Sequence, residues 1–164
     1  MVNVCMEIET TRDIARQILR HRSFSFQEFS QRYATAESFD VRECRKQDVV
    51  NRQNSIELDI LGNDNDRYLA TWWDGVQQRL TKEAEFLYQA ALSKGVAKEV
   101  ARSLLPEGLT TSRMYMNGTL RSWIHYIDIR CDKATQKEHR EVAEKCRDII
   151  FEHFPSIKEV LNAS

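Results

Sequence analysis

The polar residues best suited to bind a ligand or take part in catalysis are concentrated between Gln17 and Tyr33, in the stretch QILRHRSFSFQEFSQRY. From Arg12 to Ala34 the chain holds five arginines against two acidic residues. Guanidinium groups bind phosphate and carboxylate oxygens through paired hydrogen bonds, and they keep their charge when partly buried. This density of fixed cations predicts an anion site, most simply a phosphate site.

Local periodicity places several of these side chains on shared faces. Gln17 and Arg20 are three residues apart on a predicted helix, so they share a helical face. Glu28, Ser30 and Arg32 alternate in a predicted extended segment, so they point the same way and can line one wall of a pocket. A surface turn does not require that arrangement, which favours the anion site.

Cations near helix ends also have a purely structural explanation. The triplet Arg20-His21-Arg22 falls at the end of one predicted helix and Arg130 at the end of another. The helix dipole favours positive charge at both places. Taken singly, each is explained as a solvated helix end, and for the triplet the alternation of Glu28, Ser30 and Arg32 after it argues against this.

Arg121 and His125 form a second polar pair, four residues apart on one face of a predicted helix. That face lies roughly opposite the apolar side chains of Leu120, Trp123 and Ile127. A histidine among aromatic residues is more often a hydrogen-bonded structural group than a ligand. The residues alone leave the role of this pair open.

Hydrophobic periodicity predicts the elements that must position these side chains. Residues 2–9 alternate as a half-buried strand, and Thr10 or Thr11 can cap a short helix after it. Residues 37–62 show no sustained period and predict a long irregular loop, mobile unless a partner or ligand orders it. The fold class is therefore α+β, helix-rich with few strands, in a single domain over 1–164. Extended segments are predicted at 24–34 and 110–116, and further helices at 66–94, 98–105, 119–130 and 135–154.

The helix predicted at 66–94 is long enough to serve as a subunit contact. At 1.5 Å per residue it spans about 40 Å. Gly95 follows it directly and is a natural residue to end a helix, because glycine adopts positive φ without strain.

Composition narrows the classes of protein. The 164 residues are 41% hydrophobic and 30% charged, which suits one soluble domain, and no stretch approaches the roughly 18 apolar residues of a membrane span. The net charge of −1 argues against general nucleic-acid binding. Four scattered cysteines form no CxxC pair, so neither a metal site nor a disulfide framework is expected. We expect a cytoplasmic protein, of a bacterium or of a phage host, with no membrane or nucleic-acid partner.

The stretch RHRSFSFQEFSQRY resembles the signature of the flavin-dependent thymidylate synthases, the ThyX family. That signature is an Arg-His-Arg triplet, seven residues and then Ser, within a Glu-x-Ser-x-Arg-Tyr ending. The resemblance continues in order through VAKEVARSLLP, RSWIHYIDIR and TQKEHREVAEKC, from Val2 to about Phe154. Four blocks in order are a specific signal, whereas the triplet alone would be weak.

This resemblance implies a ThyX-like fold and a homotetramer whose active sites are built from several subunits. The implied reaction is reductive methylation of dUMP to dTMP, a methyltransferase reaction of nucleotide biosynthesis. It uses FAD as cofactor, with NADPH and methylenetetrahydrofolate as co-substrates. Cofactors carry the difficult chemistry in such enzymes, and the protein orients and polarises.

The resemblance also assigns roles by matching positions. Arg130 corresponds to the arginine that stabilises negative charge on the uracil ring and so activates C5. Ser30 has no neighbouring base and is assigned to binding, and the four cysteines to structure. The implied dUMP contacts are Gln17, Arg20, Glu28, Ser30, Gln31, Arg32, Arg130 and, from another subunit, Arg102. The implied FAD contacts are Arg20, His21, Arg22, Gln27, Glu28, Thr119, Leu120, Arg121 and His125.

The chain departs from the family pattern at several positions. Gln31 stands where many members have Gly, Gln27 where many have Asn, and Ala134 where a His is frequent. Members usually carry a segment before the strand at Val2, with a His-x-Ser and a Glu that contribute to the FAD site. The chain opens on that strand, so weaker flavin binding and an exposed sheet edge are expected.

Two alternatives to the main function follow from these observations. A related enzyme that methylates C5 of UMP would share the uracil and phosphate contacts, because the residues do not define a pocket for the 2′-hydroxyl. A short, non-catalytic form that binds a nucleotide or assembles with longer subunits would share the fold.

Overall fold

The computed structural model describes residues 2–30, 38–52 and 54–162. It contains a three-stranded sheet in the order β1-β5-β2, a two-stranded sheet of β3 and β4, and a larger set of helices. This confirms the predicted α+β class. In chain order the elements are β1 (Asn3–Thr11), α1 (Arg12–Ile18), β2 (Ser25–Glu28), β3 (Arg45–Gln47), β4 (Ser55–Glu57), α2 (Asp64–Ser93), α3 (Lys98–Ala101), a 3-10 turn η1 (Arg102–Leu104), β5 (Thr111–Thr119), α4 (Leu120–Arg130), α5 (Lys137–His153) and α6 (Pro155–Asn162).

The chain divides into two compact units. We call Met1–Ile8, Arg16–Gln27 and Met114–Ser164 the sheet–helix unit, and Glu9–Ala15 and Glu28–Arg113 the long-helix unit. Strands β1 and β5 contribute residues to both units. The boundary therefore falls within these strands and within α1, whereas α4, α5 and α6 belong to the sheet–helix unit and α2 and α3 to the long-helix unit.

The first strand and helix form as the sequence predicts. Met6 and Ile8 of β1 are buried and alternate with exposed residues, because successive strand side chains point to opposite faces. The Thr11 hydroxyl donates to Asp13 Oδ1 at 2.6 Å where α1 begins. The spacing of Ile14, Ile18 and Leu19 predicts a buried stripe on this helix; Ile14 and Ile18 are fully buried, and Leu19, just after the helix, is half-buried.

Strand β5 lies in the centre of the sheet and leads into α4. Its backbone is antiparallel to β1, since Arg12 N donates to Thr110 O at 3.0 Å and Leu120 N donates to Val2 O at 3.0 Å. The Thr119 hydroxyl then accepts from Ser122 N at 3.2 Å and caps α4. The N-terminal anchor of α4 is therefore continuous with the central strand.

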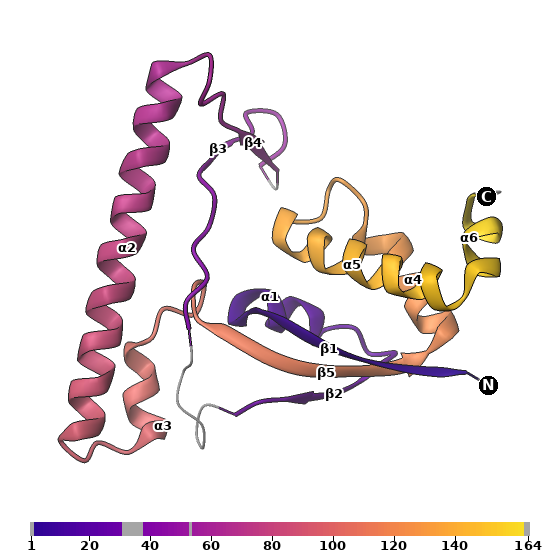
Figure 1. The fold of residues 1–164 in the computed structure, drawn as a ribbon, viewed down its shortest axis with the longest axis horizontal. Helices are drawn as coiled ribbons and strands as arrows, with labels where there is room; N and C mark the ends of the chain where they lie inside the picture. Colours follow the sequence, from indigo (N-terminus) through magenta and orange to yellow (C-terminus); the bar gives the residue numbers. More distant parts are fainter. Residues whose placement is uncertain (1, 31–37, 53, 163–164) are drawn as a thin grey trace. The chain divides into compact units, whose positions relative to one another are not determined.

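Helices α4 and α5 cover one face of the sheet in the sheet–helix unit (Figure 1). Trp123 of α4 is fully buried, and its indole Nε1 donates to Val4 O of β1 at 3.0 Å. Phe24 packs edge-on against Trp123, with ring centroids 4.9 Å apart. The core of this unit therefore lies between the sheet and α4.

Helix α5 is buried along a different set of positions from the one its apolar residues predict. The sequence places Val142, Cys146, Ile149 and Ile150 inside, but Ile149 is 43% exposed and Val142 half-buried. His139, three residues before Val142, is 0% exposed. The buried face is turned toward His139, Ala143, Cys146 and Ile150. Pro155 ends this run as predicted and begins α6.

Helix α2 is the main element of the long-helix unit. Asn63 caps it, with its side chain accepting from Asn65 N at 3.0 Å and Asp66 N at 3.4 Å. Gly95 follows it with φ 82°, which confirms the predicted helix end. Helix α3 and the turn η1 pack against it.

The segment predicted as an irregular loop at 37–62 contains a short hairpin, which corrects the sequence-based expectation. Strands β3 and β4 pair antiparallel with Lys46 opposite Ile56, and the Lys46 ammonium pairs with buried Asp66 of α2. Arg42 fixes the start of the segment, because its Nη2 donates to Asp13 Oδ1 at 2.7 Å and its backbone N donates to Gln77 Oε1 at 2.7 Å. The mobility of this segment stays a prediction, and residues 37 and 53 lie outside the described residues.

Candidate active site

The end of α1 places the Arg-His-Arg triplet beside the core of the sheet–helix unit. Ile18 is fully buried and anchors the last turn, and His21 N donates to Ile18 O at 3.0 Å as the chain leaves the helix. His21 is half-buried, whereas the side chains of Arg20 and Arg22 are exposed. At this turn the imidazole of His21 therefore points inward, and the guanidinium groups of Arg20 and Arg22 point toward solvent.

His21 meets Arg130 at the C-terminal end of α4. The Arg130 Nε donates to His21 Nε2 at 2.9 Å. Burial lowers the pKa of His21 to about 4, with the positive charge of Arg130 and then His125 acting in the same direction. The neutral ring therefore offers a lone pair to the guanidinium, and its edge packs on Tyr126 with centroids 4.9 Å apart.

Gln17 meets a buried polar group that sequence analysis missed. The Gln17 Nε2 donates to Gln136 Oε1 at 2.8 Å, and Gln17 Oε1 lies 3.3 Å from His139 Nδ1. The other ring nitrogen of His139 lies 3.2 Å from the Tyr126 hydroxyl. The signal that would have found His139 was the 139, 143, 146, 150 spacing of α5, which apolar residues alone do not reveal.

Three residues of the resemblance thus meet in the sheet–helix unit: Gln17, His21 and Arg130. The rings of His21 and His139 lie 6.2 Å apart and link the two halves of this cluster. We call Gln17, His21, Tyr126, Arg130 and His139 the imidazole cluster. It holds two neutral histidines beside one permanent cation.

The other flavin contacts of the resemblance in this unit are on β2 and on the first two turns of α4 and its cap. Arg121 and His125 are exposed while Trp123 and Ile127 are buried, as the helical spacing predicts. Gln27 is exposed on β2, Thr119 caps α4 and Leu120 is half-buried. Among the described residues, the exposed guanidinium groups of Arg20, Arg22 and Arg121 form no ion pair.

The long-helix unit contains the remaining described residues that the resemblance assigns. Glu28 Oε1 accepts from Ser112 Oγ at 2.7 Å and from Arg12 Nη1 at 3.4 Å. Ser30 is exposed, and the half-buried Arg102 donates from Nε to Glu99 O at 3.3 Å. No local pattern in the sequence predicted Ser112 or Arg12 as partners of Glu28.

Gln31 and Arg32 lie outside the described residues. The predicted common direction of Glu28, Ser30 and Arg32 therefore stays a prediction.

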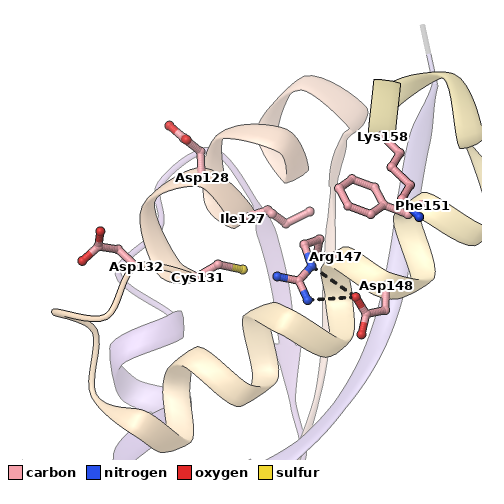
Figure 2. A pocket seen from close by; sticks show the side chains of 8 residues that line it. All are labelled: Ile127, Asp128, Cys131, Asp132, Arg147, Asp148, Phe151 and Lys158. Carbon is pink, nitrogen blue, oxygen red and sulfur yellow. Dashed lines mark hydrogen bonds and ion pairs between the residues drawn. The ribbon is translucent and has the colours of Figure 1, made fainter. Parts of the chain in front are cut away.

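A separate pocket of about 620 Å³ opens among α4, α5 and α6 (Figure 2). Arg147 pairs with Asp148 at 3.1 Å beside it, and burial raises the pKa of the Cys131 thiol, so this sulfur is protonated at neutral pH. None of the site residues assigned above is among those that line it, which are Ile127, Asp128, Cys131, Asp132, Arg147, Asp148, Phe151 and Lys158.

Within residues 2–30, 38–52 and 54–162, no three His, Cys, Asp or Glu side chains are grouped as a metal site requires. In the same part of the chain, no helix combines the length and the apolar character needed to cross a bilayer. All four cysteines are free thiols.

Comparison with known proteins identifies the family. The sequence profile described as "Thymidylate synthase complementing protein" matches residues 1–156. A protein named flavin-dependent thymidylate synthase from Synechocystis is 52% identical over 161 residues, which is 98% of this chain and 72% of that protein. This chain belongs to the flavin-dependent thymidylate synthase family.

A viral relative supports this assignment, and a solved structure shows the same fold. A protein named probable flavin-dependent thymidylate synthase from Paramecium bursaria Chlorella virus 1 is 48% identical over 96% of this chain and 70% of that protein. The crystal structure of the UMP/dUMP methylase PolB from Streptomyces cacaoi, bound with 5-Br dUMP, superposes with a TM-score of 0.81 at 23% identity. That superposition covers 98% of this chain and 70% of the other, and it confirms the ThyX-like fold.

Proposed function

We propose that this chain catalyses the reductive methylation of dUMP to dTMP, with FAD as cofactor and with NADPH and methylenetetrahydrofolate as co-substrates. Membership of the ThyX family supports the reaction class. The observation that carries the assignment of roles is the hydrogen bond from Arg130 Nε to the neutral His21 ring at 2.9 Å. It fixes a permanent cation at one place, with Gln17 in the same cluster.

Arg130 is suited to stabilise negative charge that develops on a uracil ring. A guanidinium remains charged through the reaction, so it acts without giving up a proton. Because Nε is held by His21, the rest of the guanidinium group has a fixed direction before the nucleotide binds. Preorganised charge of this kind lowers the barrier because the protein does not have to reorganise during the reaction.

The donor set of the sheet–helix unit fits a flavin dinucleotide. Arg20, Arg22 and Arg121 are exposed cations without an ion-pair partner among the described residues, and a pyrophosphate needs such groups. The neutral His21 offers hydrogen bonding without adding charge. When bound, the flavin supplies hydride transfer and carries the one-carbon unit. The protein residues bind it, orient it and polarise the nucleotide.

The nucleotide contacts assigned by resemblance belong to both units. Gln17 and Arg20 lie in the sheet–helix unit, and Glu28, Ser30 and Arg102 in the long-helix unit. Glu28 is positioned by Ser112 and Arg12, so its carboxylate direction is set before substrate arrives. Ser30 is assigned to binding, as the family resemblance implies.

A homotetramer with shared active sites is part of the proposal, and α2 supports it. Its buried residues are Asp66, Gln77, Ala84 and Tyr88, whereas large apolar side chains remain exposed on another face. Arg102 is on η1, which packs directly against α2. An interface through α2 would therefore also position Arg102 for a neighbouring subunit.

Replacing Arg130 tests the central role. In Arg130→Ala we expect kcat for dTMP formation to fall about 10²- to 10³-fold, as when one preorganised electrostatic group is removed. Flavin absorbance of the purified protein should be retained, because other residues carry flavin binding in this proposal. Arg147→Ala on α5 is the matched control, and it should turn over at the wild-type rate.

Tritium release, turnover of the variant and FAD binding distinguish the proposed function from its alternatives. Tritium release from C5-labelled dUMP should exceed release from C5-labelled UMP, and the reverse order would replace the substrate with UMP. Wild-type turnover in Arg130→Ala would show that the charge-stabilising role is misplaced. A purified protein that does not bind added FAD would support the non-catalytic alternative.

A further inference from the structure

His139 is a fully buried polar side chain that the reaction described above does not use. It is 0% exposed on α5, and the groups that act on it electrostatically are the cation of Arg130 and the titratable ring of His21. Its two ring nitrogens face Gln17 on one side and Tyr126 on the other. A buried imidazole without partners would be costly, so both ring nitrogens need a defined role.

The partners determine which ring nitrogen of His139 carries the proton. Gln17 Oε1 is an acceptor only, so His139 Nδ1, 3.3 Å away, must donate to it. His139 Nε2 then has a lone pair and accepts from the Tyr126 hydroxyl at 3.2 Å. Burial raises the pKa of Tyr126, so the phenol keeps its proton and remains a donor.

The same chain of hydrogen bonds fixes the orientation of the Gln17 amide. Its oxygen faces His139, and its Nε2 donates to Gln136 Oε1 at 2.8 Å. Gln136 is itself oriented, because its Nε2 donates to Glu138 Oε2 at 2.9 Å. An amide nitrogen carries two hydrogens, so Gln17 retains one N–H to donate to a ligand.

We propose that His139 is a positioning residue for the nucleotide site: it holds the Gln17 amide so that Gln17 donates to an acceptor oxygen of the bound nucleotide. The inference rests on the proposed function for the identity of the ligand, dUMP. A rotated amide would present an oxygen to the nucleotide, and two acceptors repel. His139 thereby acts through Gln17 and does not touch the substrate.

Binding of dUMP to the flavin-loaded full chain, measured by titration calorimetry, tests the coupling. His139→Leu should raise the Kd about 10-fold, the effect of losing about one hydrogen bond. His139→Asn keeps a donor at the position of Nδ1 and should stay within about 3-fold of wild type. His153→Leu, at the exposed end of the same helix, is the matched control and should bind as wild type.

A double-mutant cycle separates positioning from a merely structural role. In a Gln17→Leu background, His139→Leu should add no further loss of dUMP affinity, because its effect passes through Gln17. Independent, additive losses would overturn the proposal, and so would wild-type affinity in His139→Leu. If His139→Leu does not fold, the tautomer of His139 in the wild-type protein still decides the proposal, because that measurement needs no substitution at this position.

Histidine tautomers provide a test that does not depend on substrate. With histidines labelled with ¹⁵N, two-bond proton–nitrogen correlations should show His139 protonated at Nδ1 in the ligand-free protein, and Gln17→Leu should remove that preference. The Nε2–H tautomer in wild type would overturn the proposal. Failure of wild type to bind dUMP would count against the proposed function instead, and the tautomer would still decide the role of His139.

Discussion

Single buried polar groups determine how the imidazole cluster works. His21 and His139 lie beside the fixed charge of Arg130, and burial combined with that charge lowers the pKa of each to about 4. Both rings are therefore neutral at physiological pH and can accept as well as donate. A protonated His21 could not accept from Arg130, so the hydrogen bond that fixes the guanidinium requires the neutral form.

The two depressed pKa values predict a loss of stability in mild acid. An unfolded histidine has a pKa of 6.5, above the folded value of about 4, so the unfolded chain takes up protons first as the pH falls. The contribution of these histidines to the free energy of unfolding should be complete above pH 6.5 and should decline as the pH falls from 6.5 to 4. Each histidine contributes a slope of up to about 1.4 kcal/mol per pH unit. Urea unfolding at a series of pH values measures it.

Substitution isolates the histidine contribution from that of carboxylates, which also titrate in this range. The slope for His139→Asn should be shallower than that of wild type by one proton, and the exposed His153→Asn should leave it unchanged. Equal slopes in wild type and His139→Asn would show that His139 is charged, or solvated, in the folded protein.

Among the elements, β5 and the turn after α1 are in unusually close contact. A Cβ added to Gly118 would lie 2.5 Å from Cδ1 and 2.7 Å from Cε1 of Phe24. The Phe24 ring cannot simply retreat, because it packs against Trp123 and Tyr126. The glycine is therefore required for close approach and not for a special backbone angle.

Gly118→Ala should lower the free energy of unfolding by about 1–3 kcal/mol, the typical effect of overpacking a core. Gly75→Ala is the matched control: no atom lies within 4 Å of its added Cβ, and replacing a mid-helix glycine should stabilise the protein by about 1 kcal/mol. Thermal unfolding of both variants measures the difference. A Gly118→Ala protein as stable as wild type would show that Phe24 moves freely.

Elements with strong periodicity could be predicted from the sequence, and those defined by long-range pairing could not. Strand β1 and the end of α2 follow from alternation and from Gly95, which are local signals. The β3–β4 hairpin has no such signal, because the paired residues are mostly polar and exposed. Its position depends on the contact of Lys46 with Asp66, twenty residues away.

The residues of the candidate site also separate into those that local sequence signals predict and those that only long-range packing reveals. Residue types and the family resemblance predicted Gln17, His21 and Arg130, because the triplet and its spacing are local. His139 and Tyr126 were missed as site residues because their importance comes from packing between α4 and α5. A polar residue on the buried face of a helix carries no apolar signal, so the predicted face of α5 was shifted toward Ile149.

At the scale of the whole molecule, the proposed tetramer depends on α2. At about 100° per residue, the exposed apolar side chains of this helix fall within a sector of about 120°, separate from its buried face. We call these residues the α2 stripe: Tyr68, Trp72, Leu80, Phe86 and Leu87, which are 42–75% exposed. Exposed large apolar side chains that share one side of a helix favour an interaction site, and the proposed tetramer provides its partner.

Phe86→Asp tests the α2 stripe as the subunit interface. Phe86 is 66% exposed in the single chain, so the substitution should leave the fold intact while placing a charge where the interface requires burial. In sedimentation, wild type should run at about four times the 19.3 kDa of one chain, and Phe86→Asp at a smaller mass. Val49→Asp, at a 92% exposed apolar residue outside the α2 stripe, should keep the wild-type mass.

Measuring dTMP formation by the interface variant tests whether the proposed interface also completes the active site. If Arg102 of one subunit completes the nucleotide site of another, Phe86→Asp should lose dTMP formation together with assembly, although its own imidazole cluster is unchanged. Mixing it with Arg102→Ala subunits should not restore activity, because the first variant cannot assemble. A dissociated Phe86→Asp protein with full turnover would show that each chain builds a complete site, and a variant that keeps the wild-type mass would remove α2 from the interface.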